Sequence, residues 1–495
     1  MTVSSVSTVK SREYASPGRP RSGAGPTTLI GGRWFDPESR NPVFDPVDGS
    51  ELGSVGYGGA TEAGQAAAAA AEAFPSWSDT TARVRADVLL EAARLIAERS
   101  PDLGELLARE AGKRLPEAVG EVRFSAEYFR WFAEEVRRPS GAFHPNEAPA
   151  KRHLTVRRPA GVVASLTPWN FPCSIQARKL APALAAGCTV VARVSEKAPL
   201  AVTEMIRCLT DAGLPDGVVN LVHGPAAEVT DAYLSHPAVR VVTFTGSTGV
   251  GRRIMAKASE RIVRPLLELG GDGAFVVFDD ADVEAAVEGA MLAKFRNTGQ
   301  SCIAANRFLV QSKVFDEFVG RLAERIDAMS IGSGLDDPVP DLGPCIDAGR
   351  AEAVRSMVDE ALHAGARRVT RDVEVPGPAF CAPTLLVDVP DDTALATSEV
   401  FGPAAGVFRF DTEEEALQRA NGTEMGLAGY FYSRDVSRLW RFAERLEVGI
   451  VGVNDPLPTV AFAPMGGVKQ SGIGREGSDL GLEEFQDVRY LAVGL

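Results

Sequence analysis

Residues 295–302, FRNTGQSC, place a cysteine directly after a turn that contains Gly299. A cysteine at the start of a helix is stabilised as the thiolate, which is the form that attacks electrophilic carbon. If Cys302 begins a helix, it is therefore a candidate nucleophile. Most free cysteines are instead buried and inert, so the motif alone leaves both interpretations open.

Two polar residues upstream could assist such a nucleophile. Glu268 interrupts the apolar run of LLELGG, and poor solvation there would raise the pKa of its carboxyl toward the range of a general base. Asn170 lies in TPWNFP, just after the apolar run 162–166, and its amide could donate a hydrogen bond to a developing oxyanion. The alternatives are a cap or ion-pair role for Glu268 and a turn role for Asn170.

Other kinds of chemistry find little support. The 5 histidines are scattered and the 6 cysteines form no CxxC pair, so we expect no metal site. A GxxxxGK[ST] loop is missing, which argues against phosphoryl transfer. After the apolar run 241–244 comes TGSTGVG, where Gly246 and Gly251 would let a phosphate approach the start of a helix. A plain strand-to-helix turn explains that segment equally well.

The elements that must position these residues follow from the hydrophobic pattern. Residues 61–137 have the Ala, Glu, Arg and Leu spacing of amphipathic helices. Apolar runs at 162–166, 189–192, 218–222 and 241–244 then alternate with helical stretches, which is typical of a parallel sheet covered on both faces. The pattern restarts near residue 270. We therefore predict an α/β protein of two units, with a ligand in the crevice between them.

Composition bounds the function from another side. The chain has 495 residues with a formal net charge of −14, which disfavours binding to nucleic acid or to an anionic membrane. Its first 26 residues lack the apolar core of a signal peptide, and no apolar run approaches the ~20 residues of a spanning helix. Cysteine usage fits a reducing compartment. We expect a cytoplasmic enzyme that begins with a flexible tail.

The chain resembles the aldehyde dehydrogenase superfamily over about residues 28–495. The motifs that carry this resemblance occur in the family's order: LIGGRW (29–34), TPWNFP (167–172), FTGST (244–248), LELGG (267–271), GQSC (299–302), EVFGP (399–403) and PMGGVKQSGIGREG (464–477). The resemblance implies a Rossmann-like cofactor-binding domain, an α/β catalytic domain, a small β bridging arm and a homodimer or homotetramer. These divide the chain into a tail (1–27), cofactor-binding domain (28–138 and 160–269), catalytic domain (270–468) and arm (139–159 and 469–495).

The resemblance also implies a mechanism. Cys302 attacks the aldehyde carbon, Asn170 and the Cys302 backbone N–H hold the oxyanion, hydride passes to a nicotinamide, and Glu268 activates the water that hydrolyses the thioester. The residues implied to bind the cofactor are Thr167, Pro168, Trp169, Arg193, Glu196, Phe244, Gly246, Ser247, Gly251, Leu269, Glu399 and Phe401. A carboxylate at 196 favours NAD, because it repels a 2′-phosphate, whereas Arg193, where the family usually has Lys, also permits NADP.

Three further residues match the succinate-semialdehyde dehydrogenase branch. Arg178 and Arg296 stand where that branch has arginines that grip the substrate carboxylate, and Thr459 replaces its serine. The expected partner is thus a small aldehyde that carries a carboxylate. Alternatives are a longer ω-oxo acid, such as glutarate or 2-oxoglutarate semialdehyde, a broad-specificity aldehyde dehydrogenase, or a non-catalytic protein of the same fold.

Overall fold

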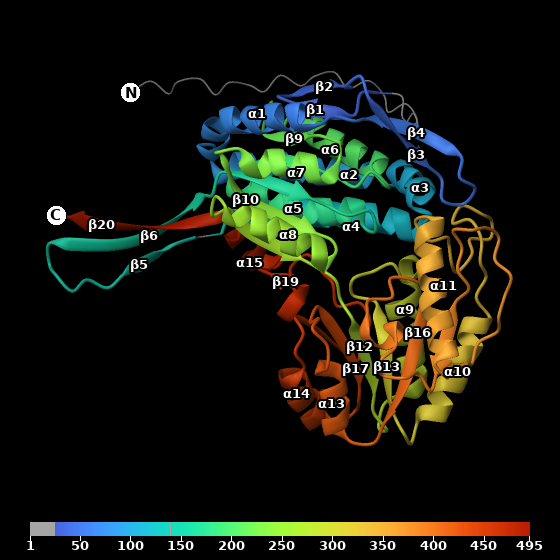
Figure 1. The fold of residues 1–495 in the computed structure, drawn as a ribbon. Coiled ribbons are helices and arrows are strands. Elements are labelled where there is room, and N and C mark those ends of the chain that lie inside the picture. Colours follow the sequence, from blue (N-terminus) through green and yellow to red (C-terminus); the bar gives the residue numbers. More distant parts are fainter. Residues whose placement is uncertain (1–24, 139) are drawn as a thin grey trace.

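The computed structural model describes residues 25–138 and 140–495, so the tail predicted over 1–27 lies almost entirely outside the described residues. Two α/β lobes are stacked one above the other, and a thin β arm projects sideways from the upper lobe (Figure 1). Among the described residues, no helix is long and apolar enough to cross a membrane. The predicted α/β fold is confirmed.

The first lobe is built on an eight-stranded sheet, the expected parallel sheet of the cofactor-binding unit. Its five central strands are parallel, while the strands at both edges pair antiparallel. In spatial order the strands are β19 (Gly472–Ile473), β11 (Arg264–Glu268), β10 (Val239–Thr245), β7 (Val162–Leu166), β8 (Thr189–Arg193), β9 (Val219–Leu221), β1 (Thr28–Ile30) and β2 (Arg33–Phe35).

Helices cover both faces of this sheet, as the near-continuous apolar runs require. Along β7, Val162 and Ala164 pack into one core and Val163 into the other, because successive side chains point to opposite faces. The helices of the first face are α1 (Ala60–Ser78), α7 (Ala226–Ser235) and α8 (Thr248–Ser259). Those of the second are α2 (Ala82–Glu98), α3 (Ser100–Ala111), α4 (Leu115–Glu135), α5 (Pro172–Ala186) and α6 (Leu200–Asp211).

The second lobe repeats this architecture with a seven-stranded sheet, parallel except for β14 at one edge. Its strands, in spatial order, are β14 (Arg367–Arg368), β15 (Thr384–Val387), β16 (Ala404–Phe410), β13 (Ala305–Gln311), β12 (Gly273–Val277), β17 (Ala428–Tyr432) and β18 (Ile450–Val453). The helices on its faces are α9 (Val283–Phe295) and α10 (Phe315–Asp327) on one side, and α11 (Ala348–His363), α12 (Ala394–Thr397), α13 (Glu413–Asn421) and α14 (Val436–Arg445) on the other.

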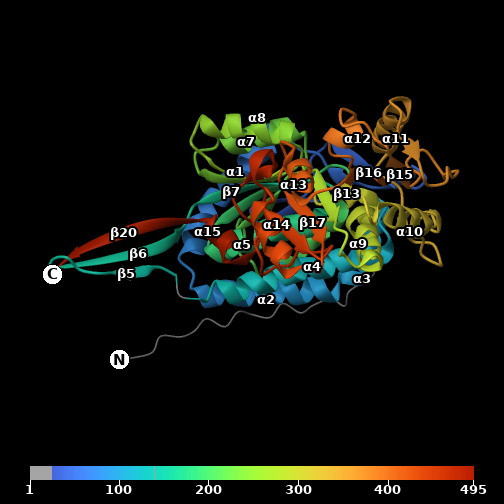
Figure 2. The same cartoon turned by 90° about the horizontal axis from the view of Figure 1, so that it is seen from below.

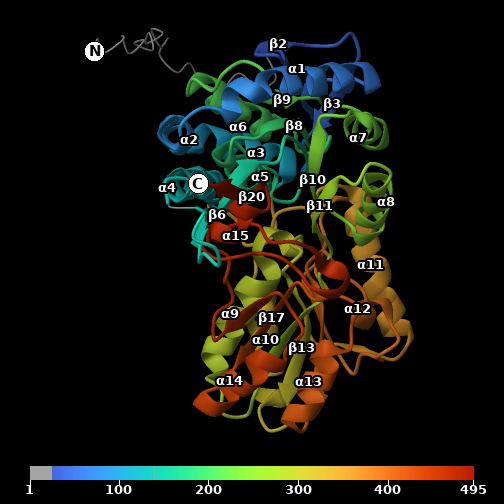
Figure 3. The same ribbon diagram turned by 90° about the vertical axis from the view of Figure 1, so that its left-hand side faces the viewer.

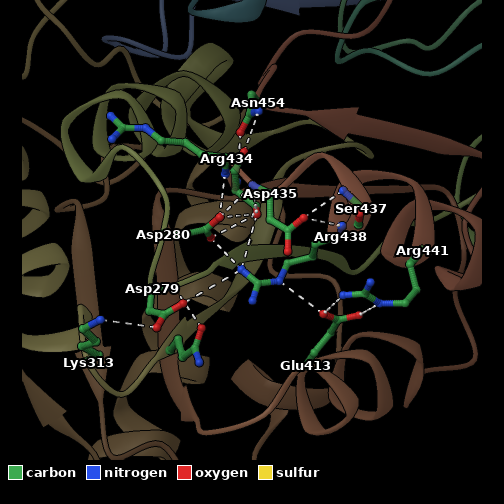
Figure 4. A network of polar contacts seen from close by, with 12 residues as sticks. Asp279, Asp280, Lys313, Glu413, Arg434, Asp435, Ser437, Arg438, Arg441 and Asn454 are labelled. Atoms are coloured by element: carbon green, nitrogen blue, oxygen red, sulfur yellow. Dashed lines mark hydrogen bonds and ion pairs between the residues drawn. The ribbon is translucent and has the colours of Figure 1, made fainter.

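The far end of the second lobe is held by a network of charged side chains (Figure 4). Asp280 follows β12 and accepts hydrogen bonds from the backbone N–H groups of Arg434 at 2.9 Å and Asp435 at 2.8 Å. Arg438 of α14 joins Asp280 at 2.6 Å to Glu413 of α13 at 3.2 Å. The network ties the ends of three elements together on the side of the lobe away from the first sheet (Figure 1).

The order of the first sheet creates a crevice. From β7 the chain moves outward through β8 and β9, then returns to place β10 on the other side of β7. Ligands of α/β proteins bind at such a reversal, beyond the carboxyl ends of the strands. This edge of the first sheet faces the second lobe (Figure 3).

The arm is a three-stranded sheet of β20 (Gln486–Gly494), β6 (Lys151–Pro159) and β5 (Ala142–His144), extending well beyond the lobes (Figures 1 and 2). The segment 469–495, which was expected to belong to the arm, lies only partly in this three-stranded sheet. Strand β19 extends the first sheet beside β11, and α15 (Ser478–Glu483) packs on α5. Of this segment only β20 belongs to the arm, because Leu482 of α15 is buried against the first lobe.

Candidate active site

Three chain segments meet where the carboxyl edge of the first sheet faces the amino edge of the second. Glu268 ends β11, Asn170 follows β7, and Cys302 precedes β13. A Cβ atom at Gly271 would lie 2.1 Å from the carbonyl oxygen of Cys302, so only glycine lets the segment after Glu268 pass the loop that carries Cys302 this closely. Gly299, with a φ of 73°, approaches the Gly402 carbonyl in the same way.

Cys302 does not begin a helix, which corrects the sequence interpretation. It lies in a turn between the short 3₁₀ segment Arg296–Gly299 and β13, and it borders the cavity described below. Burial, together with the carboxylates of Glu399 and Glu268, raises the pKa of the Cys302 thiol to about 12, while Arg178 acts in the opposite direction. Burial and these two carboxylates therefore favour the protonated thiol over the thiolate.

Glu268 has the environment that a general base needs. Its carboxyl is 1% exposed, and neither oxygen has a hydrogen-bond partner among the described residues. Burial and the nearby Glu476 carboxylate raise the pKa of Glu268 to about 8, although Arg178 and Lys179 oppose this rise. The apolar run around Glu268 therefore predicted its environment correctly, and the cap interpretation is wrong.

Arg178 is held by a counterion that the sequence analysis did not identify. Its Nε donates to Glu476 Oε2 at 2.5 Å, and Lys179 Nζ contacts the other oxygen of Glu476 at 2.5 Å. Burial alone would raise the pKa of Glu476, but Lys179 and Arg178 outweigh it and lower the pKa. Arg178 still lines the cavity beside Cys302, so it combines an ion-pair role with a position at the site.

Asn170 is hydrogen-bonded to the loop that carries Cys302. Its side-chain Nδ2 donates to the backbone carbonyl of Gln300 at 3.2 Å. The backbone carbonyl of Asn170 accepts a hydrogen bond from Asn297 Nδ2 at 3.0 Å. Asn297 and Thr298 have φ values of 53° and 56°, a strained conformation for residues other than glycine. The strain and the shared hydrogen bonds hold this loop in one shape next to Asn170.

A cavity of about 350 Å³ leads to Cys302. The guanidinium of Arg296 lies 5.1 Å from the centre of the Phe171 ring, and the Thr459 hydroxyl is buried without a hydrogen-bond partner among the described residues. The structure thus brings the three predicted substrate residues to one cavity. Its lining residues are Glu117, Gly120, Glu121, Phe124, Phe171, Ser174, Ile175, Arg178, Arg296, Ser301, Cys302, Ile303, Leu457, Thr459 and Met465.

The residues implied to contact a nicotinamide and its ribose lie beside the same loops. Trp169 and Phe401 meet edge to face, with ring centres 5.4 Å apart, and Phe401 has a φ of 50°. Glu399 accepts a hydrogen bond from the Gly271 N–H at 3.2 Å, and burial raises the pKa of its carboxyl to about 7. Thr167 is buried and hydrogen-bonded to Gln176 at 2.9 Å, while Pro168 is half-buried.

The other implied cofactor residues gather at the carboxyl ends of β10 and β8. Gly246 and Ser247 lead into α8, and the Ser247 side chain does not cap that helix, so the helix start is open to an anion. Gly251 packs against Leu269, and Phe244 packs against Gly246. An uncapped helix start at a strand reversal fits the diphosphate of a dinucleotide.

Glu196 was expected to favour NAD, and Arg193 to permit NADP. The two side chains form an ion pair with each other. Arg193 also donates to the Gly224 carbonyl at 3.3 Å and is buried, whereas the Glu196 side chain is 44% exposed. Glu196 is therefore the accessible member of the pair, able to accept from a ribose hydroxyl. Its carboxylate also neutralises the guanidinium that would otherwise attract a 2′-phosphate.

The sequence contained signals for some of the residues that its motifs did not single out. Arg178 and Lys179 are adjacent cations within α5, all of whose residues are buried, and buried cations require a counterion. Glu476, which supplies that counterion, lies within the motif GREG. Glu117 and Glu121 of α4 also reach the cavity, and nothing in their amphipathic surroundings distinguishes them from surface residues.

Comparison with known proteins agrees with this geometry. Residues 34–491 match the model of the aldehyde dehydrogenase family. The chain is 43% identical over 470 residues to the succinate-semialdehyde dehydrogenase [NADP(+)] GabD of Escherichia coli (strain K12), covering 94% of this chain and 97% of that protein. It is 43% identical over 468 residues to the glutarate-semialdehyde dehydrogenase of Pseudomonas aeruginosa, with the same coverage of 94% and 97%.

A solved structure extends the likeness to three dimensions. The crystal structure of succinate-semialdehyde dehydrogenase from Burkholderia pseudomallei superposes with a TM-score of 0.93 at 43% identity, covering 95% of this chain and 98% of that one. The matches span both lobes and all the loops that meet at Cys302. The chain therefore belongs to the aldehyde dehydrogenase family and is an aldehyde-oxidising oxidoreductase.

Proposed function

We propose that the protein oxidises succinate semialdehyde to succinate with NAD as its preferred cofactor. The observation that carries this proposal is the cavity that leads to Cys302, which presents the Arg296 guanidinium and the unpartnered hydroxyl of Thr459. Among the described residues, the Thr459 hydroxyl has no hydrogen-bond partner and the Arg296 guanidinium contacts the Phe171 ring, so a substrate carboxylate would give both groups an acceptor. A neutral aldehyde would leave both groups unsatisfied, which a binding site penalises strongly.

The proposed reaction begins when the Cys302 thiol gives its proton to water and the thiolate Sγ attacks the aldehyde carbon, which forms a C–S bond and an oxyanion. Asn170 Nδ2 and the Cys302 backbone N–H stabilise that oxyanion, and Arg178 is the cation that favours the thiolate. The carbonyl then re-forms as the C–H bond of the former aldehyde carbon breaks, which leaves a thioester on Cys302, and a bound nicotinamide would supply the acceptor for the departing hydride. Glu268 then removes a proton from water as the water attacks the thioester, so that the C–S bond breaks and the carboxylate product leaves.

The assignment of NAD rests on the exposure of Glu196 and on its ion pair with Arg193. The residues proposed to hold the cofactor are those at the ends of β7, β8 and β10, together with Glu399 and Phe401. The relative from Escherichia coli is named for NADP(+), so the preference rests on the charge of this pair rather than on family membership.

Chain length separates the main proposal from its closest rival. The relative from Pseudomonas aeruginosa is a glutarate-semialdehyde dehydrogenase at the same 43% identity, so glutarate semialdehyde is the second candidate substrate. Both substrates end in a carboxylate that Arg296 and Thr459 would bind. They differ by one methylene, which a pocket distinguishes by only about 10- to 200-fold.

The arm provides the proposed contact between subunits. Val488, Tyr490 and Val493 of β20 are exposed apolar or aromatic side chains on a strand that lies at the edge of its sheet. An exposed apolar edge strand favours pairing with another chain. We propose a cytoplasmic homodimer or homotetramer in which the arms pair.

The test is to measure kcat/KM for succinate semialdehyde, glutarate semialdehyde and butyraldehyde, each with NAD and with NADP. Butyraldehyde has the four carbons of succinate semialdehyde without its carboxylate. We expect the two acids to exceed butyraldehyde by at least about 100-fold, the loss typical of an unpaired buried polar site. Arg296→Met should abolish most of that difference. Equal values for butyraldehyde and succinate semialdehyde would refute the proposed substrate.

A further inference from the structure

Helix α4 contacts both of the loops that carry the reacting groups, although it belongs to the first lobe and contributes none of the residues assigned above. Glu117 and Glu121 stand one turn apart on the face of α4 that borders the cavity. One carboxylate binds the segment that follows Asn170. The other binds the segment that follows Arg296.

Glu121 is fixed by three contacts within the core. Its Oε1 accepts hydrogen bonds from the backbone N–H groups of Cys173 at 3.0 Å and Ser174 at 3.2 Å, at the start of α5. Its Oε2 lies 2.6 Å from Lys113 Nζ, and both side chains are nearly inaccessible. A charged acceptor on the first turn of α5 sets where the chain leaves the Asn170 loop and enters the helix.

The Lys113 ammonium connects this ion pair to the aromatic ring beside Asn170. Lys113 Nζ lies 3.9 Å from the centre of the Phe171 ring, the same ring that Arg296 approaches at 5.1 Å. A cation near an aromatic face is attracted by the ring quadrupole. The Lys113–Glu121 pair therefore holds the Phe171 ring, and this ring in turn contacts the Arg296 guanidinium at the cavity.

Glu117 acts on the second loop. Its Oε2 accepts the backbone N–H of Asn297 at 3.2 Å, directly after Arg296, where the chain enters its left-handed conformation. Arg114 lies 3.7 Å from the other oxygen of Glu117. This hydrogen bond supports the strained turn whose Asn297 side chain in turn donates to the Asn170 carbonyl at 3.0 Å.

We infer that Glu117 and Glu121 are positioning residues: Glu121, paired with Lys113, places the Asn170–Phe171 turn, and Glu117 places the turn that carries Arg296. A single helix thereby sets the distance between the oxyanion donor and the cation that selects the substrate. The part that concerns Arg296 rests on the proposed function, because Arg296 is a specificity group only for a carboxylated aldehyde. The part that concerns Asn170 holds for any aldehyde.

Glu110 provides a matched control for Glu121. It is equally buried and accepts the first backbone N–H groups of α6, from Leu200 at 2.7 Å and Ala201 at 2.8 Å, but it does not line the cavity. Both Glu121→Gln and Glu110→Gln should lower the melting temperature, and Glu121→Gln should lower it more, because it leaves the Lys113 ammonium unpaired in the core. Only Glu121→Gln should lower kcat, by about tenfold, a fraction of the ~10²–10³ lost when an oxyanion donor is removed.

The loss in Glu121→Gln should be equal for succinate semialdehyde and butyraldehyde, with KM nearly unchanged, because the oxyanion forms with either aldehyde. The double variant Lys113→Met/Glu121→Gln, which removes the unpaired ammonium, should recover stability but not kcat. An unchanged kcat in a folded Glu121→Gln protein, or the same loss in Glu110→Gln, would overturn the role of Glu121. If the single variant does not fold, the kcat of the double variant tests the same role.

Glu117 is tested by a conservative and a truncating change. Glu117→Gln keeps an acceptor for the Asn297 N–H and should retain the ratio of kcat/KM between succinate semialdehyde and butyraldehyde. Glu117→Ala should lower this ratio about tenfold, mainly through KM for the acid, as expected from losing one hydrogen bond of ~1.4 kcal/mol. An unchanged ratio in Glu117→Ala would contradict the role of Glu117. A wild-type enzyme without preference for the acid would refute the proposed function and leave the Glu121 test intact.

Discussion

Arg178, which lines the cavity at Cys302, forms a buried ion pair with Glu476, with Nε and Oε2 at 2.5 Å, and both groups act on the carboxyl of Glu268. The two residues are 298 positions apart in the sequence. Lys179 completes the group at the other oxygen of Glu476. Glu476 therefore neutralises the two cations inside the first lobe. Together the three charged groups set the electrostatic environment of the proposed base, Glu268.

Glu476→Gln should shift the pH dependence of thioester hydrolysis. The negative charge of Glu476 raises the pKa of Glu268, while Arg178 and Lys179 lower it. Removing that charge leaves both cations unopposed, so the pKa of Glu268 should fall below about 8 and the rate should reach its plateau at a lower pH. The pH midpoint is obtained from the single-turnover rate of hydrolysis of the acylated enzyme, measured from about pH 6 to about pH 9, a range that brackets the raised pKa of the base. A midpoint at the same or a higher pH would contradict the coupling.

The same substitution should destabilise the fold. Two cations would remain in the core without their carboxylate, and breaking a buried ion pair in this way costs about 3–5 kcal/mol. Urea unfolding monitored by circular dichroism gives the free energy of unfolding. The exposed pair of Arg94 and Glu98, joined at 2.6 Å, supplies the control, since Glu98→Gln should change stability by less than about 1 kcal/mol.

Glu268→Gln should stop the reaction after its first half. The variant can still form the thioester, because Cys302 and Asn170 are unchanged, but it lacks the base that activates water. We expect a burst of one reduced cofactor per active site, then a steady rate lowered by about 10²–10⁴-fold. Stopped-flow absorbance of the reduced cofactor measures both phases. Cys302→Ala should show no burst, and unchanged steady turnover in Glu268→Gln would exclude the proposed base.

Thr459→Val should weaken substrate binding without weakening the fold. The Thr459 hydroxyl is buried and has no partner among the described residues, so its removal breaks no hydrogen bond in the free protein. A hydrogen bond to a charged carboxylate is worth about 1.5–3 kcal/mol, which corresponds to about a 10- to 150-fold rise in KM for succinate semialdehyde. Thr459→Ser, which keeps the hydroxyl, should remain close to wild type. An equal rise in KM for butyraldehyde would show that the hydroxyl does not bind the carboxylate.

Glu196→Gln should improve the use of NADP. The change removes the carboxylate that repels a 2′-phosphate and releases the Arg193 guanidinium from its ion pair. We expect kcat/KM for NADP to rise by about tenfold, because a freed arginine binds phosphate through charge-assisted hydrogen bonds. Glu204→Gln, at a similar pair with Arg207 on the same lobe, is the control and should leave the ratio of NADP to NAD unchanged. A fall in NADP use in Glu196→Gln would refute the proposed basis of cofactor choice.

Much of the fold was predictable because parallel strands buried on both faces leave a simple pattern. The run predicted at 162–166 is the strand β7, and the run at 241–244 is the centre of β10. The glycine-containing motifs were equally informative, since Gly271 and Gly299 occupy places where a side chain would collide with neighbouring backbone. The segment 469–485 was assigned wrongly to the arm, because short elements such as β19 and α15 gain their stability from the lobe on which they pack.

The sequence by itself determined the α/β class, the family and the residue types at the proposed reacting centre, because apolar periodicity and close glycine contacts are local properties. Only the tertiary structure decided which charges meet. Cys302 is half-buried in a turn rather than at a helix start, where burial and nearby carboxylates raise the pKa of its thiol, and Arg178 is joined to Glu476 across most of the chain. Ion pairs and pKa values depend on the distances between charged groups and on their burial. Both are set by the tertiary fold and cannot be inferred from the order of the residues alone.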